Sequence, residues 1–238
     1  MSESTGRLYV LLGGDYAGKS RLMAELRDQV DWALVSADEG TLAPPYDTLV
    51  DMRRLFVERV LPGAGRLLSP DYVLSGLQMS LIYLRDRAAA ERARRDVLVD
   101  SYTYKLLAKC RLHGLVSPDI FRFWRSFPRP DRVIYLRTSP EVAWRRARAA
   151  GRLNRFEHHG QEPTRDGFVA FQRDLAAAMR AEVGPVATDV VDGEQDPAVV
   201  RIHVEALLGA GREEVHGDER QPLRAAGDRG ARAVHPVG

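Results

Sequence analysis

Short apolar runs alternate along the chain with longer segments in which apolar residues recur every three or four positions. An apolar run bounded by turn residues is typical of a strand buried on both faces, and the longer spacing is typical of a helix packed on one side. The runs predict strands at residues 7–12, 33–36, 97–100, 133–136 and 186–191. The helical spacing predicts helices at residues 19–31, 48–61, 71–94, 103–114, 118–126, 140–150, 164–183 and 197–208.

This alternation predicts an α/β protein with a parallel, doubly wound sheet and helices on both faces, in three layers. Ligands of such sheets bind beyond the carboxyl ends of the strands. We expect one domain over residues 1–209. Residues 210–238 lack apolar periodicity and mix Gly, Arg, Asp and Glu, so we expect a disordered C-terminal tail there.

The segment after the first predicted strand carries the clearest chemical signal. It reads Gly13, Gly14, Asp15, Tyr16, Ala17, Gly18, Lys19, Ser20 and is followed by Arg21. This fits G-x-x-x-x-G-K-[ST], the phosphate-binding loop of the P-loop NTPase fold, in its strand–loop–helix setting. Loop N–H groups would cradle the phosphates of ATP, Lys19 would reach the terminal phosphates, and Ser20 would hold Mg²⁺. A chance Gly-rich turn before a helix is the alternative.

Composition narrows the classes of partner. The 238 residues carry a formal net charge of +2, which calls for neither nucleic acid nor an anionic membrane. Cys110 is the only cysteine, which fits the reducing cytoplasm, and we expect neither a secretion signal nor a membrane span. Lysine and arginine together number 35, yet the only lysines are Lys19, Lys105 and Lys109, so a lysine at position 19 indicates a specific requirement.

Two carboxylates are candidates for the reaction centre. Asp100 ends the third predicted strand, where a carboxylate can hold Mg²⁺ or orient an acceptor; a helix N-cap is the alternative. Asp15 lies inside the loop, where a carboxylate beside phosphates needs a cation or a donor. It therefore suggests a metal or acceptor contact at the transfer site, and a loop-bracing hydrogen bond is the alternative.

Arginines cluster around a Gly-containing turn after the sixth predicted helix. Arg148, Arg152 and Arg155 are catalytic candidates, because a mobile Arg-rich lid would stabilise the charge on a transferred phosphoryl group and exclude water. A solvated basic helix face is the alternative, and it fits Arg145 and Arg146 better.

Aromatic and basic residues in the middle of the chain suggest an acceptor site. Tyr83 and Arg87 are four residues apart and share a helix face; together with Tyr102 they suit a base and a phosphate. Core tyrosines and a surface arginine are the alternative. Lys105 and Lys109 are also one turn apart, and they either supply charge at the acceptor phosphate or form an exposed pair.

The order of these motifs resembles the thymidylate kinase family of nucleoside monophosphate kinases, from about Arg7 to Leu208. The resemblance is carried by the loop with its internal Asp15 and by residues 83–88, 97–102, 130–143 and 146–157. The last segment is similar to a bacterial-type lid. In that type the catalytic arginine lies in the lid and not in the phosphate loop, and this chain agrees because the loop residue Tyr16 is not basic. The resemblance implies a homodimeric kinase of nucleotide biosynthesis that uses ATP and Mg²⁺ to phosphorylate a (deoxy)nucleoside monophosphate such as dTMP.

Departures from the family pattern concern the acceptor. Ser101 stands where the family has the arginine of Asp-Arg-Tyr, and residues 36–40 replace its Arg-Glu-Pro-Gly-Gly segment. Lys105 or Lys109 would compensate only in part, because a lysine lacks the bidentate geometry of arginine. A specialised kinase for a modified nucleotide or a non-nucleotide metabolite, and a catalytically inactive nucleotide-binding relative, are the alternatives. A GTPase switch is disfavoured, because the sole asparagine, Asn154, precedes an arginine.

Overall fold

Five strands form one parallel sheet in the computed structural model, which describes residues 6–38, 42, 46–151 and 153–218. The strands are β1 (Leu8–Gly13), β2 (Ala33–Val35), β3 (Val97–Asp100), β4 (Arg132–Arg137) and β5 (Thr188–Asp192). Their order is β2-β3-β1-β4-β5, so β1 is central and every neighbouring pair is parallel. The five predicted strands and the parallel sheet are confirmed.

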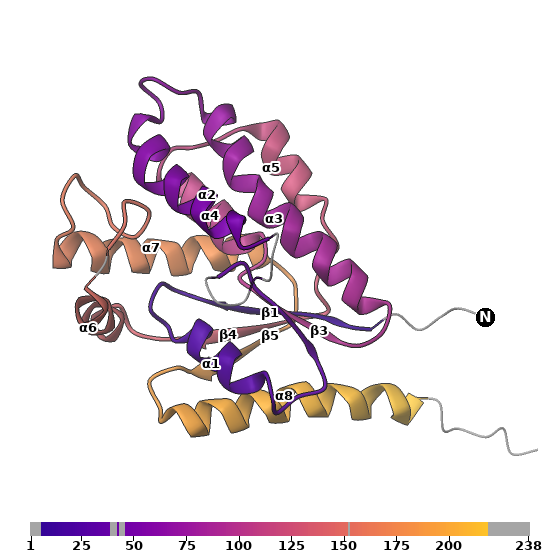
Figure 1. The fold of residues 1–238 in the computed structure, drawn as a ribbon. Coiled ribbons are helices and arrows are strands. Elements are labelled where there is room, and N and C mark those ends of the chain that lie inside the picture. Colours follow the sequence, from indigo (N-terminus) through magenta and orange to yellow (C-terminus); the bar gives the residue numbers. More distant parts are fainter. Residues whose placement is uncertain (1–5, 39–41, 43–45, 152, 219–238) are drawn as a thin grey trace, which may run out of the picture. The chain divides into compact units, whose positions relative to one another are not determined.

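Helices cover both faces of this sheet. They are α1 (Lys19–Leu26), α2 (Thr48–Leu55), α3 (Pro70–Arg92), α4 (Tyr104–Leu112), α5 (Pro118–Arg125), α6 (Pro140–Ala150), α7 (Arg165–Val183) and α8 (Pro197–Asp218). Figure 1 shows α3, α4 and α7 on one face, and α1 with the start of α8 on the other. The predicted three-layer α/β class is therefore confirmed.

Several helices begin where the sequence supplies a capping side chain. Ser69, Ser139 and Thr164 each accept a hydrogen bond from a backbone N–H in the first turn of α3, α6 and α7. In α3 and α6 the cap is followed by a proline, whose missing N–H costs nothing at that position.

The segment predicted as one helix over residues 48–61 is divided. α2 continues into a π-helical turn, η1 (Phe56–Val60), and a 3₁₀ turn, η2 (Leu61–Gly63). The ring of Phe56 packs against Tyr72 of α3 and over Gly76, where a Cβ atom would lie only 2.0 Å from the ring. π-helical turns occur mainly as single turns at functional sites, and this one lies beside the cavity described below.

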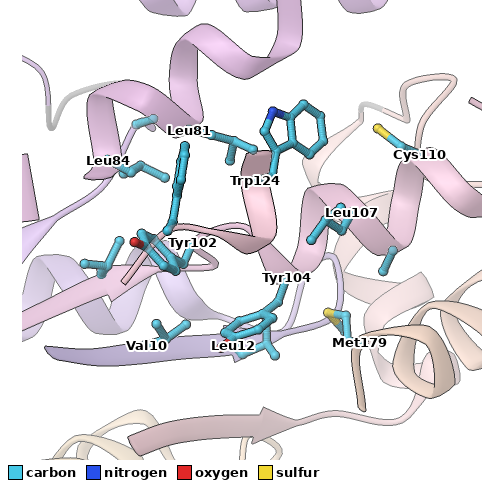
Figure 2. Close-up of a cluster of buried hydrophobic side chains, with 14 of the residues drawn as sticks. Val10, Leu12, Leu81, Leu84, Tyr102, Tyr104, Leu107, Cys110, Trp124 and Met179 are labelled. Atoms are coloured by element: carbon cyan, nitrogen blue, oxygen red, sulfur yellow. The ribbon is translucent and has the colours of Figure 1, made fainter. Parts of the chain in front are cut away.

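The core lies mainly between the sheet and the α3–α4–α7 face. Figure 2 shows Val10 and Leu12 of β1 below Leu107 of α4, with Met179 of α7 to one side of Leu12. All four side chains are almost inaccessible to solvent. Strand register aligns Leu11 of β1 with Asp100 of β3, so the end of β3 and the start of the phosphate loop meet at one edge of the sheet.

The C-terminal end differs from the prediction in one respect. α8 continues to Asp218, beyond the predicted helix end at residue 208; the disordered tail stays a prediction. The chain divides into a larger unit that ends at Glu205 and a smaller one that begins at Ala206. Residues 219–238 lie outside the described residues, and the predicted division at 209 stays a prediction. No helix in the described part of the chain is both long and apolar enough to span a membrane.

Candidate functional site

The phosphate loop joins β1 to α1 at the carboxyl edge of the sheet. β1 is buried along its whole length, which anchors the loop to the centre of the sheet. Gly18 has a φ of 102°, in the left-handed region that glycine adopts at least cost, and Lys19 begins α1 directly after it. The structure thus has the strand–loop–helix geometry in which N–H groups and a helix N-terminus face a bound anion.

The side chain of Lys19 is buried against this loop. Its Nζ donates to the carbonyl oxygen of Gly14 at 3.3 Å. Burial, and then the ammonium group of Lys105, lower the pKa of Lys19 to about 8, against the attraction of nearby carboxylates. A phosphate at this position would favour the charged form of Lys19. The charged ammonium group would in turn attract the phosphate.

Asp15 is buried in the loop and has three side-chain donors around its carboxylate. The Nζ atoms of Lys105 and Lys109 each lie 2.8 Å from Oδ1. Gln172 of α7 donates from Nε2 to Oδ2 at 2.9 Å, and its Oε1 accepts from the Asp15 N–H at 2.9 Å. Burial opposes ionisation of Asp15, but the two ammonium groups outweigh it and hold the pKa well below its usual range. Asp15 therefore braces the loop as a permanent anion.

All three lysines of the chain meet at this loop. Lys105 and Lys109 lie one turn apart on α4, and their side chains are only 16% and 10% exposed. The alternative of an exposed lysine pair is therefore wrong. Lys105 also donates from Nζ to the carbonyl oxygen of Gly14 at 3.4 Å, the same oxygen that Lys19 contacts.

Oxygen-bearing side chains lie at the helix end of the loop. Ser20 Oγ donates to Asp38 Oδ2 at 2.7 Å, and Ser36 Oγ donates to Asp100 Oδ2 at 3.4 Å. Ser36 and Asp38 are linked by a bond of 3.1 Å from the Asp38 N–H to Ser36 Oγ. Asp38 follows β2 and Asp100 ends β3, so neighbouring parallel strands bring both carboxylates to this edge.

This donor set fits a magnesium ion. Mg²⁺ prefers hydroxyl, carboxylate and water oxygens, which Ser20, Asp38 and Asp100 offer. Asp15, predicted to share this task, contacts two ammonium groups instead, and these make its surroundings unfavourable to a cation. No group of three or more His, Cys, Asp or Glu side chains that could hold a metal occurs within the described ranges.

The N-cap of α4 is Thr103, so the alternative that Asp100 caps this helix is wrong.

Backbone strain is concentrated around the same edge. Among the described residues, the non-glycine residues with positive φ are Tyr16 at 58°, Ser101 at 59° and Tyr102 at 44°. Such conformations cost of order 1–3 kcal/mol each and cluster at functional sites. Ser101 stands at the family's arginine position, and its Oγ donates to Asp100 Oδ1 at 2.8 Å. It therefore holds the Asp100 carboxylate rather than supplying a cation.

A cavity of about 700 Å³ adjoins the loop. Its lining combines Tyr16 of the loop, residues of α2, η1 and η2, and residues of the lid segment that follows α6. The polar lining includes Arg53, Arg54, Asn154, Arg155 and Glu157, and the apolar lining includes Val50, Val57, Pro62 and Leu153. Arg53 also pairs with Asp38 at 3.3 Å, which links the cavity to Ser20.

The described lid arginines Arg148 and Arg155 make their contacts with residues outside the phosphate loop. Arg148 is exposed and stacks over Trp144 at 5.9 Å from the ring centre, and Arg155 donates to the Gln161 carbonyl oxygen at 3.0 Å. Arg152 lies outside the described residues. Arg155 lines the same cavity as Tyr16 of the loop, whereas Arg148 does not line it; the catalytic role of both stays a prediction.

Arg146 has a different role from the solvated one predicted. Its Nη1 donates to the carbonyl oxygens of Tyr16 at 3.3 Å and Ala17 at 3.1 Å, and its Nη2 donates to that of Gly193 at 2.8 Å. Arg146 therefore joins the outer side of the phosphate loop to the turn that follows β5.

The predicted acceptor residues Tyr83 and Arg87 of α3, and Tyr102 after β3, do not line the cavity. Tyr83 packs against Tyr46 with ring centres 5.1 Å apart, and Arg87 pairs with Glu91 at 3.0 Å. Tyr102 is 4% exposed and belongs to the hydrophobic core (Figure 2). None of the three is among the residues that line the cavity. The core alternative therefore describes Tyr102 better.

Arg21, predicted to bind the nucleotide, points along α1. Its Nε lies 2.7 Å from Glu25 Oε1, one helical turn away, and the side chain is exposed. The structure does not bring Arg21 to the group formed by Lys19, Asp15 and Lys105.

Sequence reasoning missed three members of the site. Asp38 had a usable signal, because it follows a strand beside that of Asp100 in a parallel sheet. Gln172 and Arg53 had none, since each lies on a helix whose register against the loop depends on tertiary packing.

Solved structures with the same fold include two nucleotide-metabolism kinases. Deoxyadenosine kinase from M. mycoides has a TM-score of 0.59 at 15% identity, covering 85% of this chain and 99% of that chain. Thymidylate kinase from Candida albicans also has a TM-score of 0.59, at 13% identity, covering 87% of this chain and 93% of that chain. No protein-family model matches the chain. No curated protein matches it either.

Proposed function

We propose that this protein is an ATP-dependent phosphotransferase of the thymidylate-kinase-like type, which moves the γ-phosphate of ATP to a (deoxy)nucleoside monophosphate such as dTMP or an analogue. The observation that carries the proposal is that the phosphate loop forms part of the wall of the cavity. Tyr16 of the loop lines the cavity of about 700 Å³, and Arg53 in its wall pairs with the carboxylate that binds Ser20. A donor on the loop and an acceptor in the cavity would therefore be adjacent.

The residues of the loop would act mainly by position and charge. Lys19 and the loop N–H groups would hold the terminal phosphates of ATP. Ser20, with Asp38 and Asp100, would hold Mg²⁺, which when bound neutralises charge on the phosphate oxygens. The cavity arginines Arg53 and Arg54 would attract an anionic acceptor. Catalysis would then need no covalent intermediate with the protein.

The likeness in fold supports this proposal without naming the acceptor. The neighbours are a thymidylate kinase and a deoxyadenosine kinase, and one structure of the latter contains dCMP and dCDP. We propose by analogy a small-molecule nucleotide as substrate. The family resemblance further suggests a homodimer, which light scattering of the purified protein would test, and the single cysteine, Cys110, fits a cytoplasmic protein.

A second candidate acceptor is an unphosphorylated nucleoside or a related metabolite. It is favoured by one observation: Ser101, at the family's arginine position, bonds to Asp100 and brings no cation to the acceptor. A panel of dTMP, other monophosphates and nucleosides, assayed by ADP release, separates the two. Faster ADP release with monophosphates supports the main proposal, and faster release with nucleosides supports the second candidate.

Replacement of Lys19 tests the donor site. Lys19→Ala should lower phosphoryl transfer at least about 10²-fold, because it removes the cation at the terminal phosphates. Arg27→Ala removes an exposed cation just beyond α1 and should leave the rate unchanged. ADP release and thermal unfolding would be measured for both. Full activity in a folded Lys19→Ala protein would contradict the proposed function.

A further inference from the structure

Lys105 of α4 and Lys19 of the phosphate loop hydrogen-bond to the same carbonyl oxygen, that of Gly14. We propose that Lys105 is a catalytic residue whose ammonium group contacts the transferred phosphoryl group, the role that the resemblance assigns to a lid arginine. This inference rests on the proposed function, because it presupposes a transfer from ATP.

The position of Lys105 follows from a shared hydrogen-bond acceptor. Lys19 Nζ lies 3.3 Å and Lys105 Nζ lies 3.4 Å from the same carbonyl oxygen, that of Gly14. Two ammonium groups on one oxygen lie close together. The lysine of a phosphate loop reaches the terminal phosphates of the bound nucleotide. Lys105, which extends from α4, would therefore reach the same phosphates as Lys19 of α1.

In the described part of the lid, no arginine hydrogen-bonds to the Gly14 carbonyl as Lys19 and Lys105 do, although Arg155 lines the same cavity as Tyr16. Arg148 stacks on Trp144, Arg155 bonds to the Gln161 carbonyl, and Arg146 holds the loop from outside. Lys105, by contrast, is already in place before any substrate binds. A cation that needs no movement at the moment of reaction stabilises developing charge at low cost.

Asp15 keeps Lys105 both fixed and charged. The 2.8 Å ion pair orients the ammonium group, and Gln172 fixes Asp15 through two hydrogen bonds. Burial alone would favour the neutral amine, but Asp15 outweighs it and raises the pKa of Lys105 above its usual value. Asp15 is thus a positioning residue that acts through Lys105.

The transfer step itself is balanced. The bond between the γ-phosphorus and its bridging oxygen breaks, and the electron pair stays on that oxygen, which becomes part of ADP. A new bond forms from an oxygen of the acceptor phosphate to the same phosphorus, and no proton needs to move because that oxygen is already ionised. Lys105 would neutralise charge on the non-bridging oxygens during this exchange.

Lys109 provides a matched control. Both lysines lie on α4 and place Nζ 2.8 Å from Asp15 Oδ1; Lys109 is buried and Lys105 is half-buried. Within the described part of the chain, the contact with the Gly14 carbonyl is made by Lys105 and not by Lys109. Variants at the two positions therefore remove the same charge next to Asp15, and only one of them removes the cation beside Lys19.

The test compares Lys105→Met with Lys109→Met. Lys105→Met should lower kcat about 10²–10³-fold, in the range for loss of one preorganised donor, and Lys109→Met less than about tenfold. Lys105→Met should also lose most of the preference for AMP-PNP over ADP, measured by calorimetry, because that preference reports contact with the γ-phosphoryl group. Lys109→Met should keep it.

Several outcomes would overturn the inference. Equal losses in both variants would mean that the lysines only neutralise Asp15, and a larger fall in kcat for Arg155→Ala than for Lys105→Met would return the role to the lid. If Lys105→Met fails to fold, the pair Asp15→Asn and Asp15→Asn/Lys105→Met gives the same nucleotide comparison without a buried carboxylate that has lost one of its two ammonium partners. If the wild-type protein binds both nucleotides but transfers to no acceptor, the proposed function fails, while the nucleotide preference still tests the contact.

Discussion

At the scale of single residues, the site is defined by where lysine is used. A chain that otherwise relies on arginine places Lys105 and Lys109 on the Asp15 carboxylate and Lys19 on the neighbouring Gly14 carbonyl. An ammonium group is compact, and its pKa responds to burial, whereas a guanidinium stays charged. The lowered pKa of Lys19 therefore makes the charge of this loop depend on what is bound there.

The lowered pKa of Lys19 predicts a pH dependence of ATP binding. Burial and Lys105 lower this pKa to about 8, so in the free protein Lys19 loses its proton as the pH rises through 8. Bound phosphates favour the charged form, so ATP binding takes up protons there and the affinity for ATP falls between pH 7.5 and 9. Calorimetry in two buffers of different ionisation enthalpy measures the uptake.

Lys19→Arg is the control for this dependence, because arginine stays protonated over the whole range. Its affinity for ATP, whatever its absolute value, should not fall in the same way. Wild-type affinity that is constant from pH 7.5 to 9 would contradict the assignment of a lowered pKa to Lys19.

At the scale of elements, the wall of the cavity depends on how η1 packs against α3. Phe56 lies over Gly76 so closely that any Cβ atom at position 76 would meet its ring at 2.0 Å. Sequence periodicity predicted a helix here and could not reveal the π-helical turn, because the turn depends on a glycine 20 residues away on another helix. The same holds for Gln172, whose contact with Asp15 depends on the packing of α4 against α7.

A double-mutant cycle tests this packing. Gly76→Ala should destabilise the protein by about 1–3 kcal/mol, the usual cost of overpacking, although alanine is the better helix former. In a Phe56→Ala background the same change should be neutral or stabilising, because the ring is absent. Urea denaturation of the four proteins gives the coupling, and additive effects would show that the two residues do not meet.

At the scale of the whole molecule, the fold was predictable and the acceptor side was not. Five apolar runs and a phosphate-loop motif specify the sheet and the donor edge, because both are encoded locally. Tyr83 and Arg87 matched a family pattern in sequence, yet the cavity is lined by α2, η1 and the lid instead. Which helix faces the loop depends on how the helices pack in the assembled fold. The spacing of residues along the sequence does not reveal it.

The most direct test of the account follows the γ-phosphate itself. The protein would be incubated with [γ-³²P]ATP, Mg²⁺ and a panel of nucleoside monophosphates that includes dTMP, beside Lys19→Ala. The account predicts that label moves from ATP to a monophosphate, giving a labelled diphosphate, and that Lys19→Ala abolishes this transfer. Label that stays in ATP, or that appears only as inorganic phosphate with every acceptor, would contradict it.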